Sequence, residues 1–354
     1  MNTRTIGLAF VCIFAAVSAS SQTKFEKAVR LFNDGKIIQS KPLFLDVTKE
    51  DPRNAEAYYY LGELTINSDY DAAIDYLENA VNLNGTVAKY HFMLGNAYGV
   101  KAQRGGIFGK IGAASNCKAQ YFAAINLDAK FTEARVNIIE FYLQAPGIVG
   151  GSVEKAVAEA DTIKTYDPYA GYIAEARVYE YQKDKRKQEE CYMKAILINP
   201  KNFIAYKALW LLYMNENNVK QADEIFKKAV VSVTNTSDFY FQMGLFYVGK
   251  NEFVKAHEMF EAALKKDPKN YAVYYQFGKM DLLSGTDLRE GLSYFEKYIQ
   301  APELKNSPGH EYTYWRMGMI YEKLGKADSA RIAYKKSLEL SPDFEDAKKA
   351  LEKL

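Results

Sequence analysis

A glycine-rich segment in the first half of the chain is the first place where the sequence could bind a phosphate group. Residues 104–112 read RGGIFGKIG. A phosphate-binding loop that opens a helix needs four residues between its glycines, and a Ser or Thr after the lysine to bind Mg²⁺. Here three residues separate Gly105 from Gly109, and Ile111 follows Lys110. The sequence therefore argues against a nucleotide site at this segment.

The three histidines of the chain, His91, His257 and His310, lie far apart in the sequence. None stands at metal-ligand spacing from another His or from a Cys. Ser, Cys and His also form no recognisable nucleophile motif. We therefore expect no catalytic residue, no metal and no cofactor, and we expect that the protein is not an enzyme.

The N-terminus has the pattern of a secretory signal peptide. Arg4 is the only charged residue before Lys24, residues 6–17 are apolar, and small residues follow at 17–21. The apolar run is shorter than the ~20 residues that a membrane-spanning helix needs. We expect a signal peptide over residues 1–21 and export to the periplasm, or to the extracellular side of the cell envelope, with no transmembrane span after cleavage. An uncleaved anchor is the alternative.

Two cysteines remain in the expected mature chain, Cys117 and Cys191. An oxidising compartment permits a disulfide, but two thiols so far apart in sequence form no disulfide framework. We interpret both as small buried hydrophobic residues.

The composition indicates a folded protein without affinity for polyanions. The 354 residues are 48% hydrophobic and 25% charged, and their formal net charge is +2. These values exclude a disordered or collagen-like chain, and the charge balance gives no long-range field to attract nucleic acid. The length alone suggests two ordinary domains, and the 28 tyrosines are a large share that the fold must accommodate.

An internal period replaces that two-domain expectation. Pro200 and Pro268, each after an Asn or Asp, are 68 residues apart, which is twice 34. Between them, three residues recur 34 positions later: Ala222, Phe226 and Ala229 as Ala256, Phe260 and Ala263. A fixed period of this length is typical of stacked helix pairs.

The spacing of these residues, with Gly244 and Gly318 upstream in their units, resembles the tetratricopeptide repeat (TPR) family. The likeness is to exported bacterial members with Gly-rich insertions. It implies an all-α, right-handed superhelical solenoid of about nine helix-turn-helix units over residues 22–342, followed by a capping helix over 343–354. We expect the first helix of each unit to begin near residues 24, 55, 88, 132, 169, 203, 237, 271 and 311.

Two insertions interrupt the period, near residues 101–116 and 145–152. Both fall between the first and second helices of adjacent units, so we expect two loops that touch on one rim of the solenoid. The residues that could contact a ligand or partner there are Arg104, Phe108, Lys110, Pro146 and Ile148. The alternative is that the loops are structural elaborations.

The resemblance implies that the fifth residue of each first helix faces a concave groove. In this sequence those residues are Tyr59, Phe92, Val136, Ile173, Lys207, Phe241, Tyr275 and Trp315. One turn further, the inward residues include Leu211, Leu245 and Met319. A row of apolar and aromatic side chains predicts a partner site, although each of them could instead pack against the neighbouring repeat.

The sequence thus predicts a non-enzymatic scaffold or adaptor of the cell envelope that binds a partner peptide or helix in an apolar groove. Phe92 stands where TPR cochaperones that hold a terminal carboxylate have a lysine, so an acidic C-terminal peptide fits poorly. Two alternatives stay open: a protein that binds glycans or small molecules through aromatic side chains, and a structural subunit of an envelope assembly. The sequence indicates neither the partner nor the oligomeric state.

Overall fold

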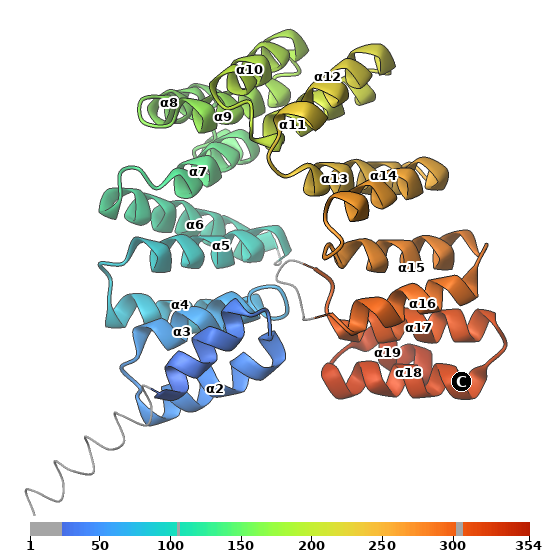
Figure 1. The fold of residues 1–354 in the computed structure, drawn as a ribbon. Helices are drawn as coiled ribbons and strands as arrows, with labels where there is room; N and C mark the ends of the chain where they lie inside the picture. Colours follow the sequence, from blue (N-terminus) through green and yellow to red (C-terminus); the bar gives the residue numbers. More distant parts are fainter. Residues whose placement is uncertain (1–22, 105–106, 302–306) are drawn as a thin grey trace, which may run out of the picture. The chain divides into compact units, whose positions relative to one another are not determined.

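The computed structural model describes residues 23–104, 107–301 and 307–354, without the side chains of residues 107–110 (Figure 1). The predicted signal peptide, residues 1–21, lies outside this part of the chain. Every regular element in the described part is a helix, and no strand occurs there. The expected all-α repeat fold is therefore confirmed.

Contacts between residues divide the chain into two compact units. Unit 1 comprises Met1–Arg30, Gln39–Pro200 and Leu211–Asn218, and unit 2 comprises Leu31–Ile38, Lys201–Trp210 and Val219–Leu354. Helix α11 (Phe203–Asn215) is shared between them.

Unit 1 is a series of helix pairs. A helix over residues 23–33 begins the described chain, and its last residues are counted with unit 2. The helices that follow are α2 (Ile37–Glu50), α3 (Ala55–Thr65), α4 (Tyr70–Leu83), α5 (Ala88–Arg104), α6 (Ile107–Leu127), α7 (Thr132–Gln144), α8 (Val153–Lys164), α9 (Pro168–Tyr181) and α10 (Lys185–Ile198).

Unit 2 continues the same pattern of paired helices. Its helices are α12 (Val219–Ser232), α13 (Thr236–Gly249), α14 (Phe253–Lys266), α15 (Ala272–Ser284), α16 (Leu288–Ile299), α17 (His310–Lys323), α18 (Ala327–Leu340) and α19 (Glu345–Glu352). The last of these packs on α18, where the sequence indicated a capping helix. Across the chain, the first helix of each pair starts within one residue of the predicted position.

Local sequence explains where several helices begin. Side chains of Asn54, Ser152, Asp167 and Asn235 each accept a hydrogen bond from a backbone N–H in the first turn of the following helix. Such caps satisfy amide groups that have no partner inside the helix. Pro168 then occupies the first position of α9, where a missing N–H costs nothing.

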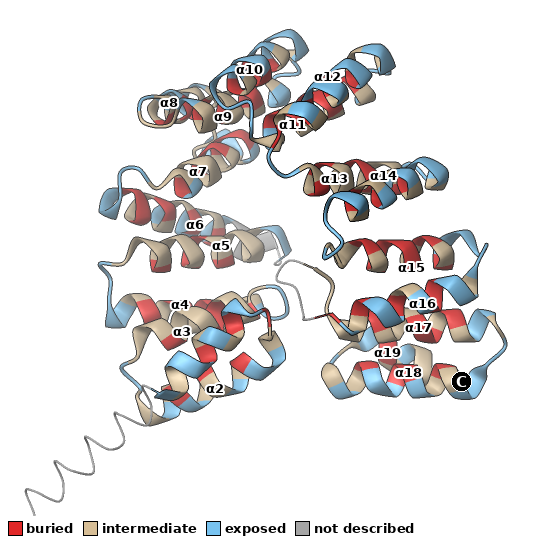
Figure 2. Ribbon diagram, viewed as in Figure 1, coloured by how far each residue is buried: buried red, intermediate tan, exposed pale blue. Residues whose placement is uncertain are grey.

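Close packing within a pair depends on a glycine of the first helix. A Cβ atom at Gly95 of α5 would lie 2.6 Å from the ring of Tyr121 on α6, and one at Gly244 of α13 would lie 2.4 Å from the ring of Phe260 on α14. The aromatic ring therefore occupies the space that a side chain would take. Buried residues follow the faces along which paired helices meet (Figure 2).

The first insertion is helical, which corrects the expectation of a rim loop. Helix α5 continues to Arg104 and α6 begins at Ile107, so these helices have 17 and 21 residues. Added helical turns satisfy backbone N–H and C=O groups within the helix, which a loop would leave to solvent. Phe108 and Lys110 thus belong to α6, and their side chains lie outside the described part.

The cysteines and the lengths of the helices bear on the predicted compartment. Cys117 and Cys191 are both buried and unpaired in the described part of the chain. None of the helices described there combines the length and apolar character needed to cross a bilayer.

Candidate functional site

The predicted inward row of unit 1 is half-buried. Tyr59 on α3 stacks on Tyr90 of α5 with ring centroids 5.3 Å apart. The ring of Phe92 on α5 packs against the rings of Tyr121 and Phe131, with centroids 6.0 and 5.0 Å apart. Val136 on α7 and Ile173 on α9 complete this row and are also half-buried. These side chains pack partly against neighbouring repeats and keep part of their surface exposed.

Polar bonds join the successive first helices of unit 1 beside this row. Lys89 on α5 pairs with Glu56 on α3 at 3.0 Å. On the next pair of helices, Asn137 Nδ2 on α7 donates to Asn96 Oδ1 on α5 at 2.8 Å. Arg177 on α9 then donates to both carboxylate oxygens of Glu140 on α7 at 2.5 and 3.0 Å. Such contacts between adjacent repeats fix the spacing of the inward face.

The inward residues of unit 2 are also half-buried, with one exception described below. Phe241 packs on Phe260 with centroids 5.6 Å apart, and Trp315 packs on Phe344 at 5.5 Å. Lys207 donates to Gln242 at 3.3 Å, and burial lowers the pKa of its ammonium group. Leu245 and Met319, further predicted inward residues, are half-buried, and so is Leu211 in the part of α11 that belongs to unit 1.

Tyr275 does not fit the predicted row. Its side chain is only 4% exposed, within the core formed by α15, α16 and α17. The rings of Phe295 and Tyr298 cover it, and its hydroxyl accepts a hydrogen bond from Arg316 Nε at 2.8 Å. The fifth position of this helix is therefore used for packing between repeats, and the expectation that Tyr275 faces a groove is corrected.

A hollow of about 530 Å³ lies along the inward row between α5 and α7. Phe92 and Val136 line it, together with Thr132, Glu133, Asn137 and Asp167. Two predicted row residues therefore border the same recess, which carries acidic side chains at its edge. We call it the row hollow.

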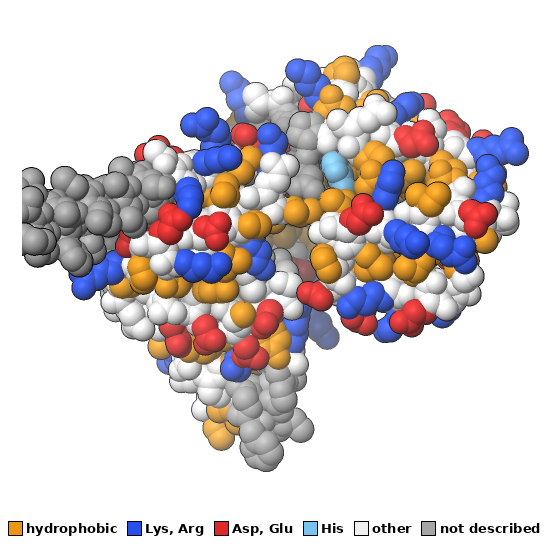
Figure 3. Space-filling view, turned by 90° about the horizontal axis from the view of Figure 1, so that it is seen from below, with side chains coloured by type: hydrophobic (Ala, Val, Ile, Leu, Met, Phe, Trp, Pro, Cys, Tyr) orange, Lys and Arg blue, Asp and Glu red, His pale blue; other side chains and the backbone are white. Residues whose placement is uncertain are grey.

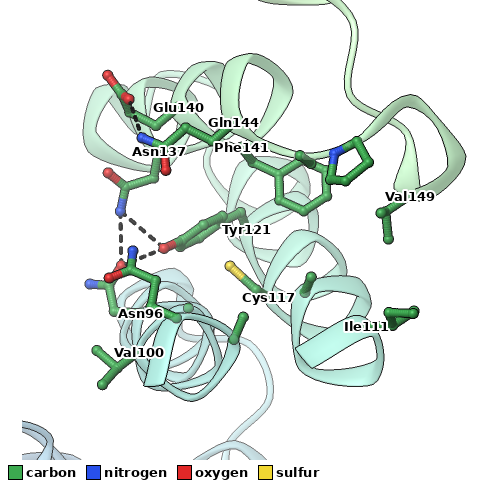
Figure 4. A pocket seen from close by; sticks show the side chains of 16 residues that line it. Asn96, Val100, Ile111, Cys117, Tyr121, Asn137, Glu140, Phe141, Gln144 and Val149 are labelled. Carbon is green, nitrogen blue, oxygen red and sulfur yellow. Dashed lines mark hydrogen bonds between the residues drawn. The ribbon is translucent and has the colours of Figure 1, made fainter. Parts of the chain in front are cut away.

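A second, larger cavity of about 650 Å³ opens between α5, α6, α7 and the second insertion (Figure 4). The residues lining it are Asn96, Gly99, Val100, Ala102, Gln103, Ile111, Ala114, Cys117, Tyr121, Asn137, Glu140, Phe141, Gln144, Ala145, Pro146 and Val149. We call it the insertion cavity. Asn137 lines both recesses.

One side of the insertion cavity is polar. Tyr121 donates from its hydroxyl to Asn96 Oδ1 at 2.7 Å and accepts from Asn137 Nδ2 at 3.2 Å. Glu140 accepts from Gln144 at 3.0 Å in addition to its pairing with Arg177. Burial raises the pKa of the Tyr121 hydroxyl, so this group stays protonated as a donor at neutral pH.

The opposite side is apolar and is built by the second insertion (Figure 4). A 3₁₀ turn, η1 (Gly147–Val149), brings Val149 to the cavity beside Ile111 of α6 and Phe141 of α7. The Ser152 amide donates to the Tyr142 carbonyl at 2.9 Å and closes the loop. Residues of both inserted segments therefore line one recess, whereas the expectation was of two loops that touch.

The predicted rim residues are exposed where they are described. Pro146 lines the insertion cavity, whereas Ile148 at the tip of η1 is 97% exposed. Arg104 is exposed at the end of α5 and donates to the Asn67 carbonyl at 3.2 Å.

Sequence reasoning did not single out Cys117, Tyr121, Asn137 or Phe141 as site residues. Cys117, Tyr121 and Phe141 occupy positions that the repeat pattern assigns to the core or next to it. Asn137 stands one position after the predicted inward residue Val136. Burial raises the pKa of Cys117 to about 11, so its thiol is protonated and is not an activated nucleophile at neutral pH.

No group of three or more His, Cys, Asp or Glu residues that could hold a metal occurs in the described part of the chain. On the face seen in Figure 3, basic and acidic side chains are interspersed with hydrophobic ones. The walls of the two recesses are thus neutral polar and apolar, apart from Glu133 and Asp167 at the row hollow and Glu140 at the insertion cavity.

Family models for the tetratricopeptide repeat match three stretches of the chain, residues 25–80, 169–202 and 312–344. These stretches coincide with the helix pairs described above. These three stretches are tetratricopeptide repeats. Among curated proteins, the comparison found no significant match.

Solved structures similar to this chain share low sequence identity with it. A TPR protein from Parabacteroides merdae is 14% identical with a TM-score of 0.47, covering 72% of this chain and 96% of that chain. A thermophilic TPR protein of Thermus thermophilus is 17% identical with a TM-score of 0.45, covering 55% and 99%. Yeast Tom70 is 12% identical with a TM-score of 0.45, covering 95% and 88%.

The tetratricopeptide repeats found in the chain occur in proteins with a common general role. TPR proteins are generally scaffolds for protein interactions, and the fold is typically non-enzymatic.

Proposed function

We propose that this TPR protein is a non-enzymatic scaffold that holds a peptide or helix of a protein partner on the inward face of unit 1. The observation that carries the proposal is the row hollow, where Phe92 and Val136 keep exposed surface on two consecutive first helices. An apolar side chain of a partner would bury against both. Partly exposed apolar and aromatic side chains in a recess are typical anchor points of interfaces.

The proposal includes export. The apolar run at residues 6–17 with small residues after it supports a cleaved signal peptide and a role in the cell envelope, in the periplasm or at the outer surface. Deleting residues 2–21 should leave the protein in the cytosolic fraction, whereas the full chain should be recovered from the envelope or periplasmic fraction in a shorter form.

The binding role is tested with variants of the row hollow. Phe92→Ala combined with Val136→Ala should reduce recovery of a co-purifying partner at least tenfold, measured by quantitative mass spectrometry against the unmodified protein. The matched control is Tyr181→Ala with Val254→Ala, which removes an aromatic and a valine side chain that are 50% and 76% exposed. The control should keep full recovery.

Folding must be separated from binding, because Phe92 contacts core rings. Ile173→Lys provides a second test at a half-buried position of the same row. Circular dichroism melts should show all variants folded. Equal partner recovery by folded row variants and by the control would contradict the proposed function.

A further inference from the structure

The insertion cavity is not needed for the proposed scaffold role, and its chemistry points to a different occupant. We propose that it binds an uncharged small molecule with an amide-like group at one end and an apolar or aromatic body at the other. Its volume of about 650 Å³ lies within the range of roughly 300–1,000 Å³ that is usual for small-molecule sites.

The lining argues for a neutral ligand. Among the described residues that line the cavity, Glu140 is the only one with a formal charge. Arg177 and Gln144 already donate to its carboxylate. A ligand carboxylate would find no cation among the described lining residues, and a ligand ammonium group would compete with Arg177 for Glu140. Burial of an unpaired charge is strongly unfavourable.

The asparagine pair argues for an amide-like end. Asn96 Oδ1 accepts two hydrogen bonds from within the network, and Asn137 Nδ2 donates to both Asn96 and Tyr121. Asn96 Nδ2 makes only a contact of 3.9 Å to Met93 Sδ, and no described residue donates to Asn137 Oδ1. Two residues that line the cavity therefore carry one amide donor and one amide acceptor without a nitrogen or oxygen hydrogen-bond partner among the described residues, which matches a ligand group that both accepts and donates.

The far side argues for an apolar body. Ile111, Phe141 and Val149 lie opposite the asparagine pair (Figure 4). Ile111 is 64% exposed although it stands beside a recess, so a ligand that covered it would remove apolar surface from water. Gly99 lines the recess between these two ends, where an added Cβ atom would lie 3.5 Å from Cys117 Sγ and 3.8 Å from the Tyr121 hydroxyl oxygen.

The recess is a feature of this chain's insertions. Ile111 belongs to the added turn of α6, and Pro146 and Val149 belong to the second insertion. A TPR unit of 34 residues has neither segment. The inference therefore concerns a site beside the row hollow and does not depend on the scaffold role.

Cys117 provides a local reporter of occupancy, and Cys191 provides an internal control. Both thiols are buried, but only Cys117 lines the cavity. The unmodified protein would be treated with methyl methanethiosulfonate, and modification of the two peptides would be followed by mass spectrometry. Three probes would be compared at about 20 mM, because small fragments bind weakly: benzamide, benzoate and glucose.

We expect benzamide to slow modification of Cys117 at least threefold while Cys191 is unchanged. Benzoate, which has the same ring and a charged group, should have no effect. Equal protection by benzoate, protection by glucose alone, or no protection by benzamide would each overturn the proposal.

A second measurement does not depend on thiol reactivity. Saturation-transfer NMR should detect benzamide binding to the unmodified protein and to Gly249→Leu, a helical glycine with open space around it in unit 2. Gly99→Leu fills the cavity and should remove the signal. A signal that persists in folded Gly99→Leu would contradict the inference.

Discussion

Asn137 on α7 and Asn96 on α5 are joined by a hydrogen bond of 2.8 Å between their side chains, and Tyr121 on α6 bonds to both. Three helices from two consecutive repeats therefore meet at one neutral polar cluster. The cluster lies between the row hollow and the insertion cavity, since Asn137 lines both. It fixes the geometry of each recess without contributing charge.

Removing the bridging hydroxyl should weaken unit 1. Tyr121→Phe leaves the ring in place but removes a donor to Asn96 and an acceptor for Asn137. Tyr121 is only 6% exposed, so water cannot fully replace these bonds. We expect the free energy of unfolding to fall by about 1 kcal/mol, measured by urea denaturation. Tyr181→Phe, at an exposed tyrosine, is the control, and equal stability of both variants would contradict this role.

A side chain at the helix-pairing glycine should be destabilising. Gly244→Ala would place Cβ 2.4 Å from the Phe260 ring, whereas Gly249→Ala on the same helix meets no atom within 4 Å. We expect Gly244→Ala to lower the free energy of unfolding by roughly 1–3 kcal/mol. Gly249→Ala should be neutral or slightly stabilising. Thermal and urea denaturation of the pair would show whether close approach is the cause.

The second insertion should depend on Gly151. A Cβ atom there would lie 1.8 Å from the Ala145 carbonyl oxygen, which is a backbone atom and cannot move away cheaply. Gly151→Ala should therefore open the loop and increase hydrogen exchange at the Ser152 amide, which donates to Tyr142. Gly147→Ala is the matched control, because it has open space around it. Unchanged exchange in Gly151→Ala would contradict the described loop.

Asp281 should give unit 2 a pH-dependent stability. Burial, and then the nearby carboxylates of Glu290 and Asp287, raise its pKa to about 6 from 3.8. A raised carboxyl pKa means that the folded state binds the proton more tightly than the unfolded chain. The ionised group is thus destabilising above about pH 6, and this effect disappears as the pH falls towards 4.

The corresponding variant is Asp281→Asn. Because the group is only half-buried, we expect a gain of roughly 1 kcal/mol in the free energy of unfolding at pH 7.5 after allowing for solvent screening. The gain should vanish near pH 4, as measured by urea denaturation at both pH values. A gain that is the same at pH 4 and pH 7.5 would show that titration of Asp281 is not its cause.

The repeat period in the sequence predicted the fold well, because glycine, alanine and aromatic positions must recur wherever two helices pack closely. The repeat period predicted the surroundings of individual side chains less well. Tyr275 has the same register as Phe241, but the bond from Arg316 and the covering rings bury it. The prediction for the first insertion was wrong. Its glycines suggested a loop, whereas the chain adds helical turns to α5 and α6.

The insertion cavity could not have been predicted from the period. The period places Asn96 and Glu140 at inward positions, but the other walls include two segments that break the period and Asn137, which differs from the expected inward register by one position. Only the three-dimensional packing of α5, α6 and α7 brings these residues together.

The most direct test of the scaffold role is site-specific photo-crosslinking with a photoreactive amino acid at Val136 or at Ile332. Val136 borders the row hollow, whereas Ile332 is 59% exposed on α18, the second helix of its pair. The account predicts a discrete crosslinked protein from Val136, lost when Phe92→Ala is added, and none from Ile332. The same crosslinks from both positions, or a product only from Ile332, would contradict it.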